Sequence, residues 1–225
     1  SVLLPKLRTL QQDRTLTVVP TPMKPLTLAS PLARVLLTVQ LMELPGLPPE
    51  RVQAHPAAAA FPGPVLREAR RVTRSLEIDT RVPAWHSTGL YAPPGEVVTV
   101  QVPPQAADKE LSVRIGAHSD ALWDHDSWSR CPDICSRRPL AAPSTRAATA
   151  FGGLVYVEVP NGCPLGIISV RIAGRLDIGV AGQQHVRIER LEERRAILPR
   201  VRPGQKVQER MRLPLLRTFI QQEAA

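Results

Sequence analysis

Five short segments between residues 70 and 174 alternate apolar and polar residues, or consist of β-branched residues, and Pro or Gly follows several of them. Alternation with a two-residue period places one side of a strand in a core and the other in water. Several such strands close together in sequence are typical of an antiparallel β-sandwich. We therefore predict a mainly β fold. The predicted strands are 72–79, 97–102, 111–115, 154–159 and 168–172.

A short helix is predicted near residues 32–44, the first long stretch free of Pro and Gly. Ser30 followed by Pro31 is typical of an N-cap with proline at the first helical position. Leu37, Leu41 and Leu44 would share one face of this helix. Only 4% of the residues are aromatic, so we expect a core of Val, Leu, Ile and Ala.

The pattern divides the chain into three parts. Residues 1–66 form a Pro-rich lead-in that contains the short helix, and its segment 45–66 is a connector. Residues 67–174 form the predicted sandwich. Residues 175–225 form a basic tail, in which 186–198 is predicted to be a charged helix because opposite charges stand three and four residues apart.

The net charge is +9, from 29 basic and 20 acidic residues. Such a charge suits nucleic acid or an anionic membrane surface, and an Arg-rich tail that binds one of them is an alternative function. The basic residues are interleaved with Glu and Leu, however, and no nucleic-acid-binding motif accompanies them, so we expect no nucleic-acid partner.

Three cysteines suit a reducing compartment. No apolar run is long enough to span a bilayer.

Four motifs carry a resemblance to a known family. Residues 87–96 read Ser-Thr-Gly-Leu-Tyr-Ala-Pro-Pro-Gly-Glu and resemble the entry strand of the enhancin-type, mucinase-like metallopeptidase domain. Segments 114–120, 151–157 and 166–172 resemble its later strands, in the same order. Within that group, the chain is most similar to the TRP-melastatin channel-associated factors. The resemblance covers about residues 50–174, and no resemblance is seen beyond Arg175.

The resemblance implies a non-catalytic fragment that regulates a membrane ion channel, or its traffic, through protein–protein binding. The implied partner is a TRP-melastatin-type channel, and the implied location is cytoplasmic, peripheral to the plasma membrane. The motif residues, with a structural or binding role, are Trp85, Thr88, Gly89, Leu90, Tyr91, Pro94, Gly95, Gly116, His118, Asp120, Gly152, Gly153 and Tyr156.

Catalysis in enhancin-type peptidases needs His-Glu-x-x-His on a helix, which places two imidazoles on zinc and the Glu beside the metal-bound water. None of the five histidines of this chain begins that motif. We therefore expect no enzyme, no catalytic or metal residue and no cofactor. The alternative is that the sandwich is an accessory domain of such a zinc peptidase and binds carbohydrate or substrate.

Three local features have two interpretations each. The polar cluster 118–128 with Cys131 and Cys135 is expected to be a surface loop, with Trp123 or Trp128 packed on the sandwich, rather than a metal site. Trp85 is expected in the core of this aromatic-poor domain, with a carbohydrate contact as the alternative. Gly152 and Gly153 are expected at a close approach or bulge in a strand rather than in a phosphate loop.

Overall fold

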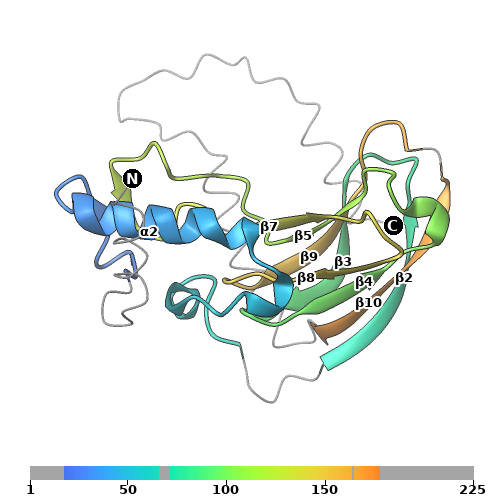
Figure 1. Ribbon diagram of the computed structural model, residues 1–225, viewed down its shortest axis with the longest axis horizontal. Coiled ribbons are helices and arrows are strands. Elements are labelled where there is room, and N and C mark those ends of the chain that lie inside the picture. The colour runs from blue at the N-terminus through green and yellow to red at the C-terminus, as the bar shows by residue number, and fades with distance from the viewer. Residues whose placement is uncertain (1–17, 66–70, 164, 178–225) are drawn as a thin grey trace, which may run out of the picture. The chain divides into compact units, whose positions relative to one another are not determined.

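The computed structural model describes residues 18–65, 71–163 and 165–177, which form antiparallel strands with one α-helix among them (Figure 1). Short 3-10 helices lie at Leu44–Gly46, Pro49–Arg51, Pro56–Ala59 and Pro104–Ala106. The helix and the strands are α2 (Pro31–Glu43), β1 (Leu26–Thr27), β2 (Arg71–Asp79), β3 (Trp85–Ala92), β4 (Val98–Gln101), β5 (Ser112–Ile115), β6 (Ser127–Trp128), β7 (Ser136–Pro139), β8 (Ser144–Ala147), β9 (Gly153–Glu158) and β10 (Ile167–Asp177).

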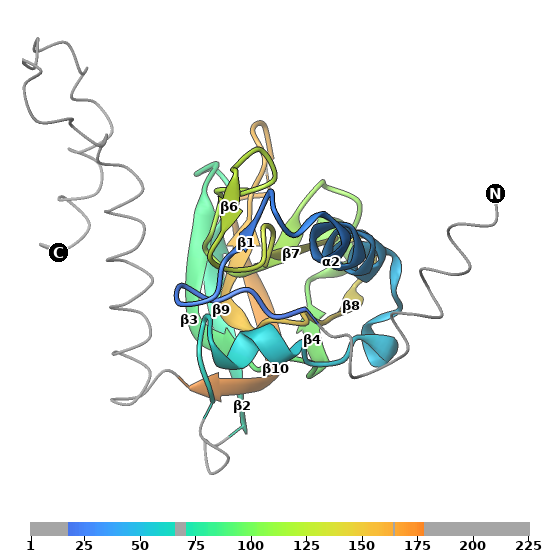
Figure 2. The same cartoon turned by 90° about the vertical axis from the view of Figure 1, so that its left-hand side faces the viewer.

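An eight-stranded sheet folds into two halves that enclose one core. Its strands run in the order β7-β5-β9-β3-β10-β4-β8, and β2 pairs with β10. The end of β10 joins the halves, because Leu176 and Asp177 pair with Tyr91 and Leu90 of β3, whereas earlier residues of β10 pair with β2 and β4. Figure 2 shows the two halves facing each other. The predicted mainly β, antiparallel fold is confirmed, with the refinement that its layers are hydrogen-bonded to each other.

The core between the halves follows from the alternation in the sequence. Val113 and Ile115 of β5 and Val155 and Val157 of β9 are fully buried. They pack with residues of β2, β4 and β10 from the other half, such as Ile172. The residues between them, including Arg114 and Tyr156, point to the outer face of β5 and β9.

Four strands have no counterpart among the predictions: the two-residue strands β1 and β6, which pair with each other, and the edge strands β7 and β8. β7 reads Ser-Arg-Arg-Pro and β8 reads Ser-Thr-Arg-Ala, so neither has the β-branched alternation that marks the others. Each lies at an edge of the sheet and pairs with one neighbour, β7 with β5 and β8 with β4. Their extended form therefore comes from tertiary pairing rather than local propensity. At the other end, β10 continues past Gly174 to Asp177, with a register shift between Ala173 and Arg175.

A second apolar cluster packs beside the sheet under α2. The helix starts at Pro31 as expected, although the Ser30 side chain makes no capping hydrogen bond. Leu37 and Leu41 are buried in this cluster, and Leu44 packs against it. Arg34 of α2 donates to the carbonyls of His125 and Asp126, which ties the loop before β6 to the helix. Trp128 packs in this second cluster rather than in the core between the halves.

The connector after α2 is an ordered part of the structure. Val52, Ala57 and Ala58 lie in the second cluster. The His55 amide donates to the Ala150 carbonyl at 2.8 Å.

In the part of the chain that the structure describes, we find no helix with the length and apolarity that crossing a bilayer requires. The predicted charged helix at 186–198 lies outside the described residues.

Candidate functional site

The outer face of β3, β9, β5 and β7 carries a connected group of side chains, in which Trp85 and Arg137 are exposed and Glu158 is buried beneath them. We call it the Trp85 face, and its residues are Trp85, Arg114, Arg137, Tyr156 and Glu158. The register places Trp85 opposite Glu158, and Arg114 opposite both Tyr156 and Arg137. Four adjacent strands thus bring the five side chains onto one surface, since residues of equal register share a face.

Arg114 is the centre of the Trp85 face. Its Nε donates to the Gly116 carbonyl at 3.1 Å, and its Nη2 donates to the His118 carbonyl at 3.0 Å. Its Nη1 lies 3.4 Å from the Glu158 carboxylate. The guanidinium carbon is 4.0 Å from the centroid of the Trp85 ring, which is a cation–π contact. With each of its three guanidinium nitrogens hydrogen-bonded, Arg114 forms a rigid support for the indole.

Glu158 balances the positive charge beneath the Trp85 face. Its carboxylate accepts a hydrogen bond from the Ser112 hydroxyl at 2.7 Å and another from Arg137 Nε. Burial alone would raise the pKa of the Glu158 carboxyl. The hydrogen bonds from Ser112 and Arg137, with the charges of Arg137 and Arg114, outweigh burial and hold that pKa below its usual range. Glu158 is therefore ionised at neutral pH.

The structure corrects the prediction that Trp85 belongs to the core. Trp85 is 44% exposed, and its ring centroid lies 6.0 Å from that of Tyr156 on the same face. The parity of β3 explains the error: Thr88, Leu90 and Ala92 are buried against the core side. Residues two apart in a strand share a side, so the even-numbered residues of β3 face the core and the odd-numbered Trp85 faces outward. The odd–even alternation along this segment can be read from the sequence. Arg114, Arg137 and Glu158 were not among the predicted site residues.

The remaining motif residues of β3 and its turn hold the backbone in place. The Thr88 hydroxyl donates to the Val155 carbonyl at 2.7 Å, and Leu90 is fully buried. Gly89 has a φ of +64° within the register shift between Ser87 and Tyr91. Tyr91 packs on Leu154. Gly95, next to Pro94, has a φ of +73°, and a Cβ there would lie 2.6 Å from the Ala54 amide nitrogen.

The other motif glycines stand where two chain segments almost touch. A Cβ on Gly116 would lie 2.9 Å from Cys135 Sγ. A Cβ on Gly152 would lie 2.9 Å from the Tyr91 hydroxyl, and one on Gly153 would lie 2.7 Å from the Gly116 α-carbon. These glycines therefore serve close packing, as expected for Gly152 and Gly153.

His118 and Asp120 lie at the end of the predicted polar cluster. His118 is buried, and its Nδ1 is 3.8 Å from Asp120 Oδ1. Burial, followed by the charge of Arg130, lowers the pKa of His118 to about 4. Asp120 instead pairs with Arg130 Nη2 at 2.5 Å.

Burial raises the pKa of the Cys131 thiol to about 12 and that of Cys135 to about 11. The His118 imidazole and the two thiols are therefore neutral at physiological pH.

Zinc, which an enhancin-type peptidase would require, does not fit the residues described here. Among residues 18–65, 71–163 and 165–177, no three His, Cys, Asp or Glu side chains are placed to share a metal ion. The whole sequence also lacks His-Glu-x-x-His. The organised chemistry of the Trp85 face is that of binding: an aromatic plane, a fixed cation and a hydrogen-bonding rim.

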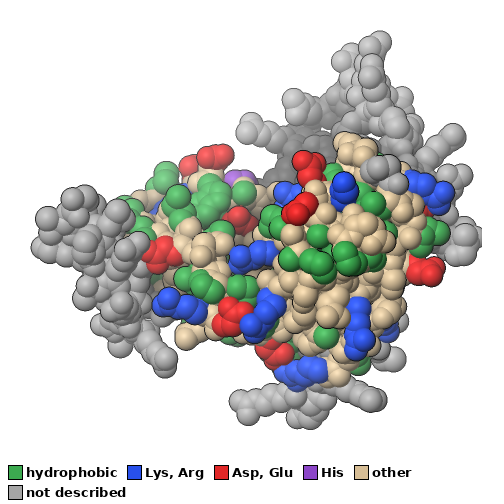
Figure 3. Space-filling view, turned by 45° about the vertical axis from the view of Figure 1, so that its right-hand side comes forward, with side chains coloured by type: hydrophobic (Ala, Val, Ile, Leu, Met, Phe, Trp, Pro, Cys, Tyr) green, Lys and Arg blue, Asp and Glu red, His purple; other side chains and the backbone are tan. Residues whose placement is uncertain are grey.

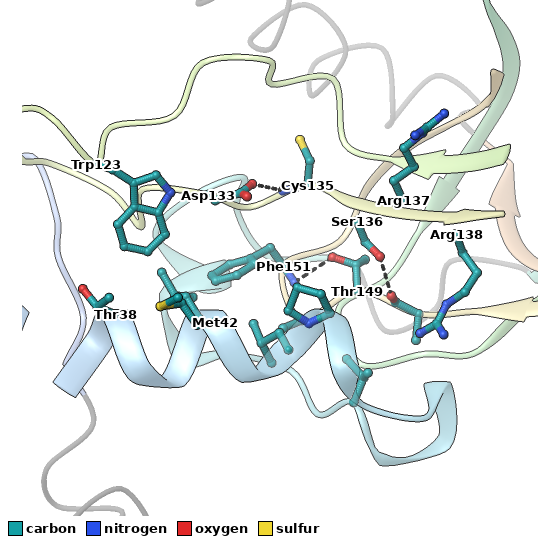
Figure 4. Close-up of a pocket in the computed structure, with 16 residues that line it drawn as sticks. Thr38, Met42, Trp123, Asp133, Cys135, Ser136, Arg137, Arg138, Thr149 and Phe151 are labelled. Carbon is teal, nitrogen blue, oxygen red and sulfur yellow. Dashed lines mark hydrogen bonds between the residues drawn. The ribbon is translucent and has the colours of Figure 1, made fainter. Parts of the chain in front are cut away.

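A separate groove of about 530 Å³ runs between α2 and the segment that enters β7 (Figure 4). Its walls include Leu41 and Met42 of the helix and Phe151 of the turn before β9. Trp123 lies at one end of the groove and Arg138 at the other (Figure 4). No motif of the sequence pointed to this groove, because its walls come from separate parts of the chain, within 38–52, at Trp123, and within 133–138 and 148–151.

Comparisons with known proteins agree with the motifs. Residues 67–173 match the family model of the N-terminal domain of M60-like peptidases. The chain is 37% identical over 90 residues to TRPM8 channel-associated factor 1 of Bos taurus, which is 40% of this chain and 10% of that protein. It is 35% identical over 101 residues to the TRPM8 channel-associated factor homolog of Xenopus laevis, or 44% of this chain and 11% of that one.

The matching segment spans about a tenth of the length of these curated relatives. Among solved structures, the IMPa metallopeptidase from Pseudomonas aeruginosa overlaps 58% of this chain and 16% of its own, at 16% identity and a TM-score of 0.38. An overlap at that level carries no argument about function. The predicted resemblance to both groups is confirmed by the family model and by the channel-associated relatives.

Proposed function

We propose that this chain, whose residues 67–173 match the N-terminal domain of M60-like peptidases, is a non-catalytic binding module that associates with a TRP-melastatin-type channel. Its relatives at 35–37% identity are named TRPM8 channel-associated factors, and this supports the choice of partner. In this proposal the module acts at the cytoplasmic side of the plasma membrane and affects the regulation or traffic of the channel.

The observation that carries a binding role is the arrangement of Trp85 on Arg114. Trp, Tyr and Arg are the residues that most often dominate the energy of protein–protein interfaces. Here Trp85, Tyr156 and Arg114 share one face, and Arg114 is fixed by three hydrogen-bonding partners before any ligand arrives. A face that is ordered in advance loses little conformational entropy on binding.

The distribution of charge favours a protein partner over nucleic acid. On the face seen in Figure 3, Lys and Arg side chains are scattered among Asp, Glu and hydrophobic groups rather than joined in one basic surface. Several arginines are paired with carboxylates, such as Arg81 with Asp79 and Arg146 with Glu50. Binding of a phosphate backbone depends on a concentration of unpaired positive charge.

Co-precipitation tests the proposal. The tagged chain is expressed with a TRP-melastatin channel, and recovery of the channel is measured beside a full-length relative as the positive control. We expect the channel to be recovered, and we expect recovery to be unchanged by a zinc chelator. If the relative recovers the channel and this chain does not, the proposed partner is wrong.

A second candidate function rests on the same exposed indole. The face of an aromatic ring in a sheet surface can stack on the apolar side of a sugar, and the exposed Arg137 on the same outer face is a donor for hydroxyls. Trp85 would then make the module an accessory carbohydrate-binding domain of a zinc peptidase. A glycan array separates the two functions, because specific retention of one glycan class, lost in Trp85→Ala, would favour the carbohydrate.

A further inference from the structure

The groove between α2 and the segment entering β7 has the features of a peptide-binding site that is distinct from the Trp85 face. Its volume of about 530 Å³ lies in the range of ligand sites in proteins. Three apolar side chains, Leu41, Phe151 and Val52, are buried in the second cluster and also line the groove. The walls are therefore fixed by the packing of the domain.

One end of the groove is suited to an apolar side chain. Trp123 lies there across from Met42, with Phe151 between that end and the middle (Figure 4). Trp123 is held by an edge contact to the buried Trp128, at 5.5 Å between ring centroids. Met42 is 72% exposed, and its flexible thioether can adapt to an inserted group.

The other end of the groove carries a positive charge. Arg138 Nη2 donates to the Leu47 carbonyl at 3.1 Å, which is a neutral group. Among the ion pairs of the described residues, none includes Arg138. Arg137 differs, because Glu158 balances it on the opposite side of the strand. Asp133 also lines the groove, on the side of Trp123 rather than of Arg138 (Figure 4), and its carboxylate accepts from the Cys135 amide at 3.2 Å.

We propose that this groove binds a short extended peptide of the partner protein that presents an apolar side chain to Trp123, Met42 and Phe151 and a carboxylate to Arg138. The two ends of the groove, one apolar and one cationic, give the peptide a direction as well as a composition. This inference rests on the proposed function as a binding module, and it adds a second contact to the Trp85 face.

The test measures anisotropy of fluorescein-labelled peptides with the full chain. The first peptide alternates Leu and Glu, the second replaces Glu with Lys, and the third replaces Leu with Ser. We expect the Leu–Glu peptide to bind about tenfold or more tightly than either of the others, with an affinity that falls as salt rises.

Matched variants assign the binding to the groove. Met42→Glu places a charge at the apolar end and is expected to weaken binding of the Leu–Glu peptide about tenfold or more. Val35→Glu is the control, since Val35 is 47% exposed on the same helix and does not line the groove. Arg138→Gln removes the charge and is expected to weaken binding and to reduce its salt dependence.

Equal binding of the three peptides, binding of none, or full binding by Met42→Glu would overturn the assignment of the groove. A concentration-dependent dimer of the chain that Met42→Glu abolishes would also overturn it, because a second copy would then fill the groove. Recovery of the channel by the same chain in any of these cases would leave the proposed function standing, so the two failures are distinguishable.

Discussion

Gly153 at the start of β9 meets Gly116 at the end of β5, and a Cβ on Gly153 would lie 2.7 Å from the Gly116 α-carbon. The approach holds the two strands together just beyond their last paired residues, Ile115 and Val155. Neither glycine has room for a side chain, and both have positive φ, +99° at Gly116 and +147° at Gly153.

Gly153→Ala is therefore expected to destabilise the domain by about 2 kcal/mol or more, from backbone strain and the clash with Gly116. Gly46→Ala is the control, because a Cβ there meets nothing within 4 Å. Urea unfolding followed by circular dichroism measures both. A Gly153→Ala domain as stable as Gly46→Ala would contradict the packing described here.

Substitution by Ala is expected to destabilise the domain far more at Trp128 than at Trp85. Trp128 is 3% exposed and lies in the second cluster. The guanidinium carbon of Arg34 lies 4.0 Å from the centroid of its ring. Its loss is expected to cost about 3–5 kcal/mol of unfolding free energy, whereas the loss of Trp85 is expected to cost about 1 kcal/mol or less. Thermal denaturation of the two variants compares them, and a reversed order would show that the two indoles have been placed wrongly.

Arg114→Lys is expected to destabilise the domain even though the charge is kept. Lysine cannot donate to Gly116, His118 and Glu158 at once, and it lacks the plane that lies against Trp85. We expect a loss of about 1–3 kcal/mol, with a change in indole fluorescence as Trp85 loses its support. Arg171→Lys, on an exposed position of β10, is the control and should change neither quantity. An unaltered Arg114→Lys variant would mean that the network does not order the face.

Stability is expected to fall as the pH drops from 6.5 towards 4. Burial lowers the pKa of both His55 and His118 to about 4, whereas the ordinary pKa is 6.5. Between pH 6.5 and pH 4 the two imidazoles bind protons in the unfolded chain but remain neutral in the folded chain. Unfolding therefore becomes more favourable as the pH falls, by up to roughly 3 kcal/mol per histidine. The depressed pKa of Glu158 acts in the same direction at lower pH.

Urea unfolding between pH 8 and pH 4 measures this dependence, and a His55→Gln, His118→Gln double variant is the comparison. We expect the double variant to lose much of the slope between pH 6.5 and pH 4. His86 lies outside the buried set and hydrogen-bonds the Val82 carbonyl, so His86→Gln should keep the slope. A slope that persists in the double variant would assign the acid sensitivity to other groups.

The strands that could be predicted from the sequence are those whose own residues decide the outcome. β2, β4, β5, β9 and β10 alternate or are rich in Val and Ile. The predicted bounds of the first four fall within one residue of the observed ones, whereas β10 continues from the predicted end at residue 172 to Asp177. The short helix was predicted because Pro31 starts it and its leucines repeat on one face. Local pattern was sufficient in these segments.

The features that could not be predicted depend on contacts between distant segments. β7 is a strand because β5 pairs with it, and the second cluster joins α2, the connector, the loop before β6 and the turn before β9. The low aromatic content of the chain predicts a core position for Trp85, but the alternation of sides along β3 places it on the outer face. The groove has no local sequence pattern, since Met42, Trp123 and Arg138 line the same groove only in the folded chain.

The most direct test of the account is recovery of a TRP-melastatin channel by the chain with Trp85→Ala, measured against the unchanged chain. Circular dichroism and the melting temperature first confirm that the variant is folded. We predict that the folded variant loses about tenfold or more of its channel affinity, because Trp85 is the exposed anchor of a face that Arg114 orders. Undiminished recovery by the folded variant would contradict the claim that this face is the binding surface.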